Sequence, residues 1–330
     1  MAKLILTNSS GDMDITNMVT TITWGGDYNQ CARTLDFGIL ATNTDINIDY
    51  VECELGQVVR LFDGDTLLFF GYVFARDRST DGNTVDVKCF DRGVYLNRNK
   101  ASYNFTGATP ESITAKICGD FGISTATVAQ TGIGVSRVFL GCGLYEIIMT
   151  AYTEAAKKNG EKYIIRFDGE HLNVFKKQVT QNAVRIESGV NLMTANYSES
   201  IENMINRVAI YDKDDNFVKY VANEEYIRLY GLMQEYVKQT EKENKFDEAD
   251  KLLKDNGIER KISVENIGDT RCITGQSVIV REPYTGLYGS FFIDSDVHTW
   301  KNGMYLNKLT LNFENIMDEK EAGNLPKEDE

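Results

Sequence analysis

The chain has 330 residues and a formal net charge of −14, and these values exclude several classes of protein. The length allows two or three domains with separate cores, and a hydrophobic content of 42% excludes disorder over the whole chain. The negative charge argues against binding nucleic acid in a basic groove, which needs clustered Lys and Arg. It is compatible with nucleic acid that passes by without binding, or with a role in solubility alone.

The sequence predicts neither a targeting segment nor disulfides. The longest apolar run, residues 67–75, has nine residues, whereas a membrane-spanning helix needs about 20. The first residues lack an apolar stretch of the length found in secretory signals, so we expect synthesis and assembly in a cytoplasm. None of the six cysteines belongs to a Cys-x-x-Cys pair, and we expect reduced, buried thiols rather than disulfides or metal ligands.

Residues 1–100 predict a first β-barrel-like module. Apolar and polar residues alternate over residues 35–39, as they do in a strand with one buried face. Two further segments with strand-like patterns occupy residues 56–61 and 67–73. The sequence Asp63-Gly64-Asp65 between them predicts a hairpin, because glycine tolerates the positive φ of a tight turn.

Residues 101–190 predict a small α+β domain. Thr109, which is followed by proline, predicts the N-cap of a helix that Gly122 ends. An apolar stripe with helical spacing predicts a second helix at about 143–158. A hairpin is expected next, with its turn at Asp168-Gly169.

Residues 191–316 predict a second β-barrel-like module that carries a helical insertion at about 223–256. Apolar residues in the insertion follow helical spacing: Tyr226, Tyr230, Met233 and Val237. We expect a helical hairpin there, which serves either as a coiled-coil partner site or as a solvated surface element. Residues 317–330 are acidic and contain no aromatic residue, so we expect a disordered tail.

The second module repeats the layout of the first. Residues 275–280 and 289–293 form a hairpin pattern like that of 56–61 and 67–73, at an offset of 275 − 56 = 219 residues. This spacing is too long for a solenoid, whose repeats span roughly 20–50 residues. The chain contains either two similar modules or two β-meanders that resemble each other by chance. We predict a mixed β and α+β fold in which two similar β-barrel-like modules flank the small α+β domain.

Candidate chemical residues are few, because the chain contains only two histidines, His171 and His298. Alternation along a strand would place Asp294, Asp296 and His298 on one face, where they could form a metal or acid/base site. Alternatively, they form a polar strand edge with His298 bonded locally, and His171 flanks a turn. We favour the second interpretation, because no other His or Cys is placed to complete a ligand set. The sequence thus predicts no catalytic, cofactor-binding or metal-binding residue and no cofactor.

Five segments of the chain resemble one known family in their order and spacing. They include Phe90-Asp91 followed by Tyr95-Leu96, and the helix end Phe121-Gly122-Ile123. The full set is residues 89–100, 113–123, 144–148, 198–208 and 289–311. Together they resemble the baseplate hub proteins of contractile phage tails, in the version found in Gram-positive myophages, defective prophages and phage-tail-like bacteriocins. The resemblance covers most of residues 15–316.

This resemblance implies a structural protein rather than an enzyme. Hubs of this family have two β-barrel modules per chain and form homotrimers, so three chains supply six pseudo-equivalent modules that line a central channel. Such a ring is a symmetry adaptor between the hexameric tail tube and the trimeric spike. We therefore expect a component of a virion or phage-tail-like particle, assembled in the bacterial host cytoplasm, with the tube, the spike and other baseplate proteins as partners.

Two alternatives belong to other functional classes. The first is a peptidoglycan hydrolase of a tail tip that acts through acidic residues, which Asp294→Ala or Asp296→Ala would inactivate. The second is a glycan-binding β-module, which usually exposes aromatic residues on one strand face. We assign the aromatic residues of the two hairpins to cores and subunit contacts instead: Tyr72, Phe74, Phe291 and Phe292.

Overall fold

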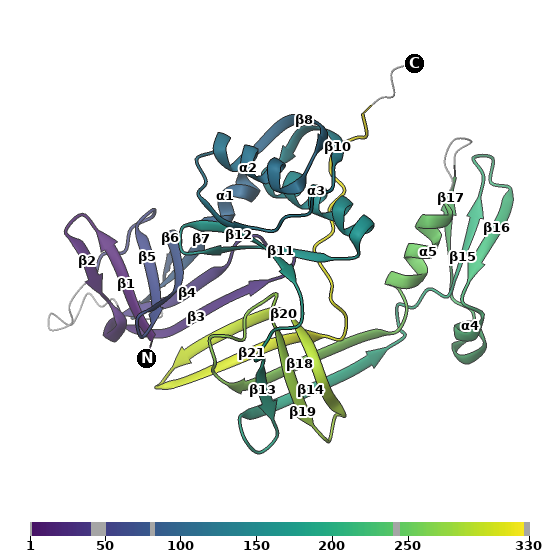
Figure 1. Cartoon of the computed structure of the whole chain (residues 1–330). Helices are drawn as coiled ribbons and strands as arrows, with labels where there is room; N and C mark the ends of the chain where they lie inside the picture. The colour runs from purple at the N-terminus through teal and green to yellow at the C-terminus, as the bar shows by residue number, and fades with distance from the viewer. Residues whose placement is uncertain (1, 41–50, 80–82, 240–244, 327–330) are drawn as a thin grey trace. The chain divides into compact units, whose positions relative to one another are not determined.

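The computed structural model describes residues 2–40, 51–79, 83–239 and 245–326. The chain divides into two compact units, of which unit 1 comprises residues 1–195 and 263–330 and unit 2 comprises residues 196–262. The fold is mostly β with few helices, in line with the β character of the predicted mixed fold, and its largest sheet has 13 strands (Figure 1).

The first seven strands, which we call the N-terminal strand set, confirm the predicted β character of this region. Its core comes from the alternation of apolar and polar residues, which buries Leu35, Phe37 and Ile39. The predicted hairpin is β5 and β6, with Gly64 at φ 57° in the turn. The strands are β1 (Ala2–Asn8), β2 (Gly11–Asp14), β3 (Val19–Asp27), β4 (Thr34–Leu40), β5 (Val58–Asp63), β6 (Thr66–Arg78) and β7 (Thr84–Asp91), and a 3-10 turn at Thr16–Met18 precedes β3.

A middle α+β region follows, and both predicted helices are confirmed. The side chain of Thr109 accepts a hydrogen bond from the Ser112 N–H and so caps α2. Gly160 ends α3 in the left-handed conformation. The elements are α1 (Gly93–Arg98), β8 (Lys100–Ala108), α2 (Pro110–Asp120), β9 (Thr125–Val128), β10 (Val135–Gly143), α3 (Leu144–Asn159), β11 (Lys162–Asp168) and β12 (His171–Lys177).

The remaining strands of the large sheet form the C-terminal strand set. They are β13 (Val184–Glu187), β14 (Leu192–Ser200), β18 (Glu259–Ile267), β19 (Ser277–Glu282), β20 (Leu287–Lys301) and β21 (Met304–Asn312). Along the sheet the order is β14-β18-β21-β20-β3-β4-β7-β6-β5-β1-β2, and β19 pairs with both β20 and β13. The antiparallel pair β20·β3 therefore joins the two strand sets.

Both strand sets contain the same three-stranded meander. The strands β5-β6-β7 and β19-β20-β21 are antiparallel neighbours in chain order. The β6·β7 pairing shifts register between Val73 and Ala75, and the β20·β21 pairing shifts register between Ile293 and Ser295. A bulge thus interrupts the middle strand of each meander.

Unit 2 contains β15 (Arg207–Tyr211), β16 (Phe217–Ala222), α4 (Glu224–Tyr230), β17 (Gln234–Lys238) and α5 (Phe246–Asp255). The prediction of a helical hairpin over 223–256 is wrong, because β17 lies between the two helices. Gly231 ends α4 at φ 84°, and the segment after it pairs in parallel with β15. Met233 and Val237 continue the helical spacing of Tyr226 and Tyr230 in the sequence, but both residues follow the helix end at Gly231.

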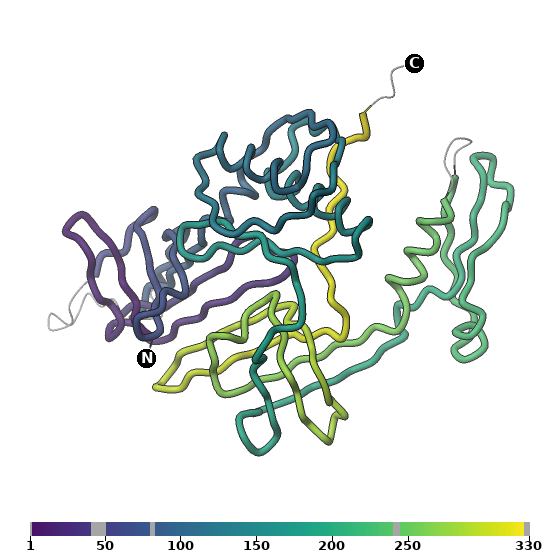
Figure 2. Tube along the Cα trace, viewed as in Figure 1, coloured from purple at the N-terminus to yellow at the C-terminus, as the bar shows by residue number. Residues whose placement is uncertain are grey.

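The prediction of a disordered tail is also wrong for residues 317–326. Met317 packs into the core of the middle region, and Tyr145 donates a hydrogen bond of 2.9 Å to Asp318. Val138 and Asn324 exchange two backbone hydrogen bonds of 2.9 Å. Figure 2 shows this yellow segment running alongside the teal middle region. Composition could not reveal these contacts, because their partners lie far away in the sequence. Residues 327–330 lie outside the described part of the chain.

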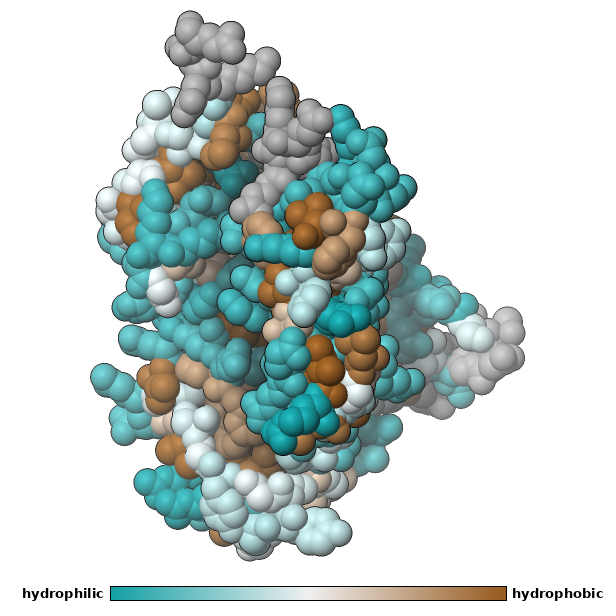
Figure 3. Space-filling model, turned by 90° about the vertical axis from the view of Figure 1, so that its right-hand side faces the viewer, coloured by the Kyte–Doolittle hydropathy of each residue, from teal (hydrophilic) through white to brown (hydrophobic). Residues whose placement is uncertain are grey.

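On the side drawn in Figure 3, hydropathy does not by itself mark a functional region. Hydrophobic residues form separate patches among hydrophilic ones in this view, which is normal for protein surfaces. No helix in the described ranges is both long and apolar enough to cross a membrane. The six cysteines are free in the structure, and five of them are buried as predicted, whereas Cys142 is half-buried.

Candidate functional site

The predicted trio of Asp294, Asp296 and His298 lies on β20, the strand that joins the two strand sets. Asp296 and His298 come together, with 3.1 Å between a carboxylate oxygen and Nε2. Asp294 lies apart from them, because the bulge in β20 falls at this residue. The strand is central rather than an edge, since it pairs with β21 on one side and β3 on the other. Our expectation of a polar strand edge is therefore wrong.

Asp296 is the centre of a fully buried polar cluster. Both of its carboxylate oxygens accept hydrogen bonds from the guanidinium of Arg33, which precedes β4. The backbone N–H of Thr274 donates to Oδ1 of Asp296 at 2.6 Å, and the Thr274 hydroxyl donates at 2.5 Å. The Arg33 guanidinium also lies over the ring of Trp24, 4.2 Å from its centroid. One carboxylate thus ties together three segments of unit 1.

His298 continues this cluster to the neighbouring strand, as local bonding predicts. Its Nδ1 atom lies 2.7 Å from the Tyr305 hydroxyl and 2.6 Å from the Asn307 amide nitrogen. The amide nitrogen can only donate, so Nδ1 accepts and the ring proton resides on Nε2, facing Asp296. The ring also lies 4.6 Å from that of Trp24. The histidine is therefore held on every side by protein groups.

Charge in the cluster is balanced. Burial raises the pKa of Asp296, but the positive charge of Arg33, the hydrogen bonds from Arg33 and the nearby ring of His298 outweigh it. The pKa of Asp296 consequently lies well below its usual range, and the carboxylate stays ionised. A buried ion pair with this many hydrogen bonds is an arrangement that fixes geometry. It leaves no carboxylate oxygen of Asp296 for a substrate or a metal ion.

Asp294 occupies a different environment near the middle region. It accepts a hydrogen bond of 2.9 Å from the Asn312 amide, and its other oxygen lies 3.9 Å from the Lys177 ammonium. Burial raises the pKa of Asp294, opposed by Asn312 and Lys177. Burial lowers the pKa of Lys177, opposed by Asp294. Within the described residues, no group of three or more His, Cys, Asp or Glu could hold a metal ion.

The sequence did not reveal the other members of the cluster. Nothing in the sequence distinguishes Arg33 from a surface arginine, although it lies 263 residues from its partner. Asn307 and Tyr305 alternate on β21, so a pairing of β20 with β21 would have placed them near His298. His171, by contrast, is exposed and flanks the turn of the β11·β12 hairpin as predicted.

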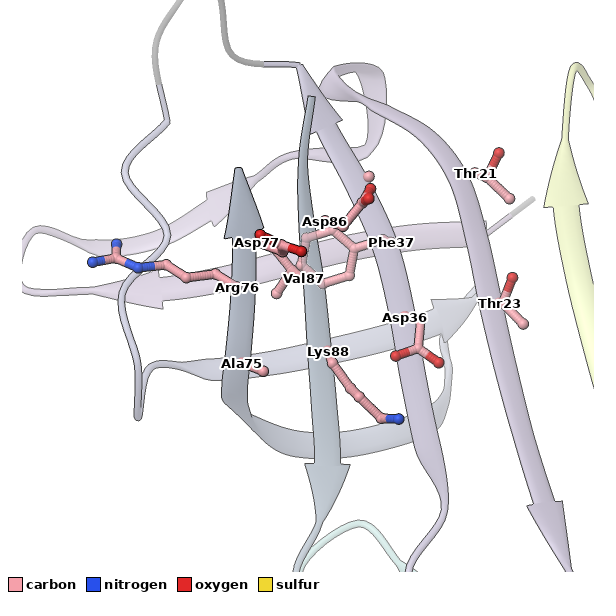
Figure 4. Close-up of a pocket in the computed structure, with 11 residues that line it drawn as sticks. Thr21, Thr23, Asp36, Phe37, Ala75, Arg76, Asp77, Asp86, Val87 and Lys88 are labelled. Carbon is pink, nitrogen blue, oxygen red and sulfur yellow. The ribbon is translucent and has the colours of Figure 1, made fainter. Parts of the chain in front are cut away.

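A second polar feature lies on the N-terminal strand set, on the face opposite to its hydrophobic core. A hollow of about 330 Å³ crosses β3, β4, β7 and β6. Figure 4 shows Thr21 and Thr23 on one side of it, and Lys88 extending toward Asp36. Burial raises the pKa of Asp36, and the charge of Lys88 opposes this rise. The lining mixes hydroxyls with charges of both signs, and it includes neither His nor Cys.

Comparison with known proteins gives a consistent result. Residues 22–312 match the model of a family described as YQBQ-like. The phage-like element PBSX protein XkdQ of Bacillus subtilis (strain 168) is 24% identical over 276 residues, which is 78% of this chain and 84% of that protein. The uncharacterized protein YqbQ of the same strain is 25% identical over 260 residues, 74% of this chain and 79% of that protein.

Solved structures share the fold. The 43 kDa tail protein of prophage MuSo2 from Shewanella oneidensis has a TM-score of 0.69 at 17% identity, with 94% of this chain and 97% of that chain covered. A tail protein from Neisseria meningitidis MC58 has a TM-score of 0.62 at 12% identity, with 94% and 96% covered.

Proposed function

This chain belongs to the YQBQ-like family, and from that premise we propose that it is a structural, non-enzymatic protein of a phage tail or tail-like particle, specifically a homotrimeric baseplate hub. The names of its relatives and the fold it shares with tail proteins support the tail assignment. The observation that supports the trimer is the antiparallel pairing of β20 with β3, which we call the seam. The chain contains a second strand that corresponds to each of these two strands.

Two equivalent modules are supported by matching strand orders. The N-terminal strand set runs β3-β4-β7-β6-β5-β1, and the C-terminal strand set runs β14-β18-β21-β20-β19-β13. Local hydrogen bonds match too. The Gly56 N–H donates to the Val73 carbonyl at 2.8 Å, and the Gly275 N–H donates to the Ile293 carbonyl at 3.1 Å. One difference remains, since β1·β5 is antiparallel and β13·β19 is parallel.

In this correspondence β20 matches β6 and β3 matches β14. The seam β20·β3 thus has a counterpart that would be β6·β14. Within the described part of the chain, Ala75–Asp77 of β6 pairs only with β7, and β14 ends the sheet. We infer that β6 of one copy pairs with β14 of the next. Such a head-to-tail contact gives a closed ring if the rotation closes, and a trimer would then contain six equivalent modules.

A largely polar face of the sheet, interrupted by the exposed Val297, supports a channel lining. Thr23, Asp36 and Lys88 stand on the face opposite to the core of the N-terminal strand set. Across the seam, Ser295 and Thr299 alternate with the buried residues of β20. We infer that this face lines the hub channel, where hydroxyls and balanced charges would not bind a passing polymer strongly. The tube, the spike and other baseplate proteins are the proposed partners, in a particle assembled in the host cytoplasm.

Light scattering across a concentration series tests the trimer. We expect a mass of about three times 37.2 kDa at high concentration or with the tube and spike proteins co-expressed. A monomer under all of these conditions overturns the proposal.

A pair of introduced cysteines tests the seam itself. Val297 pairs with Gly25, the seventh residue of β3. In the proposed β6·β14 pairing, Asp77 on β6 corresponds to Val297, and Ser198, the seventh residue of β14, corresponds to Gly25. Asp77→Cys with Ser198→Cys should form disulfides between copies on oxidation. The control pair replaces Asp77→Cys by Asp65→Cys, at the exposed β5–β6 turn, and should not. Equal cross-linking of both pairs would refute the seam.

A further inference from the structure

The three-stranded sheet of unit 2 has two faces of different composition. One face carries aliphatic residues, and α5 covers it (Figure 1). Its buried residues are Val208, Ile210 and Val237. The other face has no covering element among the described residues of unit 2, and it carries aromatic side chains. We call it the aromatic face, and its members are Arg207, Ala209, Tyr211, Phe217, Tyr220, Ala222, Gln234, Tyr236 and Lys238.

The aromatic face is a built surface rather than scattered exposed residues. Phe217, Tyr220 and Tyr236 are 55%, 51% and 58% exposed. The ring of Tyr211 lies 5.9 Å from that of Phe217 and 6.2 Å from that of Tyr236. Ala209 pairs with Tyr220 on one side and with Tyr236 on the other, so only a small side chain lies between these two tyrosines. Single exposed aromatic residues need no explanation, but four adjacent rings on one sheet face do.

Polar donors lie at one end of this face. Arg207 donates to the Gln234 side-chain oxygen at 2.7 Å, and its guanidinium lies 5.3 Å from the centroid of the Tyr220 ring. These contacts hold a guanidinium and an amide in fixed positions beside the rings. The other cation of the face, Lys238, is paired with Asp215.

We propose that the aromatic face binds a glycan chain. The C–H groups of a sugar ring carry partial positive charge and pack on the negative face of an aromatic ring. Sugar hydroxyls and acetamido carbonyls accept hydrogen bonds from guanidinium and amide donors, and tyrosine hydroxyls add further partners. A carboxylate, Asp215, reaches the face only at the end opposite Arg207, where it is paired with Lys238. Among its strand-paired members no aliphatic residue is larger than alanine, and the exposed Val218 lies in the bulge of β16, so the face is poorer in aliphatic residues than the apolar core of a protein interface.

Sedimentation with insoluble glycan tests this inference, using the full chain with chitin and with purified peptidoglycan as probes. We expect the wild-type chain to sediment with at least one probe. Tyr220→Ala and Tyr236→Ala should each weaken binding about tenfold, as truncation of a central aromatic contact does. Tyr230→Ala is the matched control, because this exposed tyrosine lies on α4 of the same unit, and it should bind as wild type does.

Three outcomes would overturn the proposal. The wild-type chain could fail to sediment with either probe, or both aromatic-face variants could bind normally. The variants could also lose a tail-protein partner while the wild type binds no glycan, which would make the face a protein docking site. Unchanged melting temperatures of the variants exclude unfolding as a cause. The inference does not depend on the proposed hub, since glycan binding and trimer mass are measured separately.

Discussion

At the scale of single residues, the fully buried pair of Arg33 and Asp296 is the feature with the largest energetic consequence. Moving two charges out of water costs several kcal/mol per ion, and only close geometry with additional hydrogen bonds compensates for it. Thr274, His298 and the ring of Trp24 supply those additional contacts. The pair therefore fixes the positions of β3, β4 and β20 relative to one another.

Asp296→Ala should destabilise the protein strongly, because it leaves the Arg33 charge buried without its carboxylate. We expect a loss of about 3–5 kcal/mol in the free energy of unfolding, measured by urea denaturation. The double variant Arg33→Met with Asp296→Leu should recover much of this loss, since both charges are removed together. The exposed Asp65→Ala should stay within about 0.5 kcal/mol of wild type. If Asp296→Ala were equally mild, the cluster would have no structural role.

Asp91 should make stability depend on pH near neutrality. It accepts backbone hydrogen bonds from Arg33 and Gly93, yet burial raises the pKa of Asp91 to about 7. Unfolded chains have an Asp pKa of about 3.9, so between pH 4 and pH 7 only the folded state retains this proton. The contribution of Asp91 therefore lowers stability as pH rises through that window.

Asp91→Asn should remove this dependence. Relative to wild type, the slope of unfolding free energy against pH should change by up to about 1.4 kcal/mol per unit between about pH 4 and 7. Denaturation at several pH values within this range measures it. Parallel curves for the two proteins would show that Asp91 does not titrate there.

At the scale of secondary-structure elements, the sequence predicted what local patterns determine. The N-cap at Thr109 and the Gly64 turn are both present, because each depends on residues next to one another. Contacts between distant segments were not predictable in the same way. The β17 strand depends on pairing with β15, and the order of residues 317–326 depends on α3 and β10. Where a neighbouring strand supplies the partners, as for His298, the sequence indicated local bonding but not full burial.

Truncation after Ile316 should destabilise the middle region, because it removes Met317 from the core and Asp318 from Tyr145. Loss of one large buried side chain costs about 2–5 kcal/mol, and hydrogen exchange of the α3 amides should rise accordingly. Truncation after Pro326 is the control and should leave exchange unchanged. Identical exchange in both truncated chains would restore the expectation of a disordered tail.

At the scale of the whole molecule, residues 201–258 form most of unit 2 and are an insertion between two strands that are neighbours in the sheet, β14 and β18. Replacing residues 201–258 by a short glycine linker should therefore preserve the proposed trimer, whose seam uses only strands of the large sheet. Light scattering of the shortened chain should give three times its own mass. A shortened chain that stays folded but monomeric, beside a trimeric full-length chain, would transfer the trimer contact to unit 2.

The family of this chain is recognised over residues 22–312 rather than at any single site. Asp294, Asp296 and His298 were the best chemical candidates in the sequence, but the bulge separates Asp294 from the other two, and Arg33 bonds the carboxylate of Asp296. The aromatic face escaped prediction, because a helical assignment for β17 placed Tyr236 on the wrong element. Alternation in β17 was a signal for it, but β17 is short, and a bulge between Phe217 and Tyr220 breaks the alternation in β16.

The separation of 263 residues between Arg33 and Asp296 also has a consequence for how the protein is made. The N-terminal strand set leaves the ribosome long before β20 does, so β3 can pair with β4 but keeps its other edge unpaired, and Arg33 lacks its counter-charge. Native pairing of such distant segments is slow and leaves strand edges open during synthesis. The first third of the nascent chain should therefore remain sensitive to proteases and in need of chaperones until the last strands leave the ribosome.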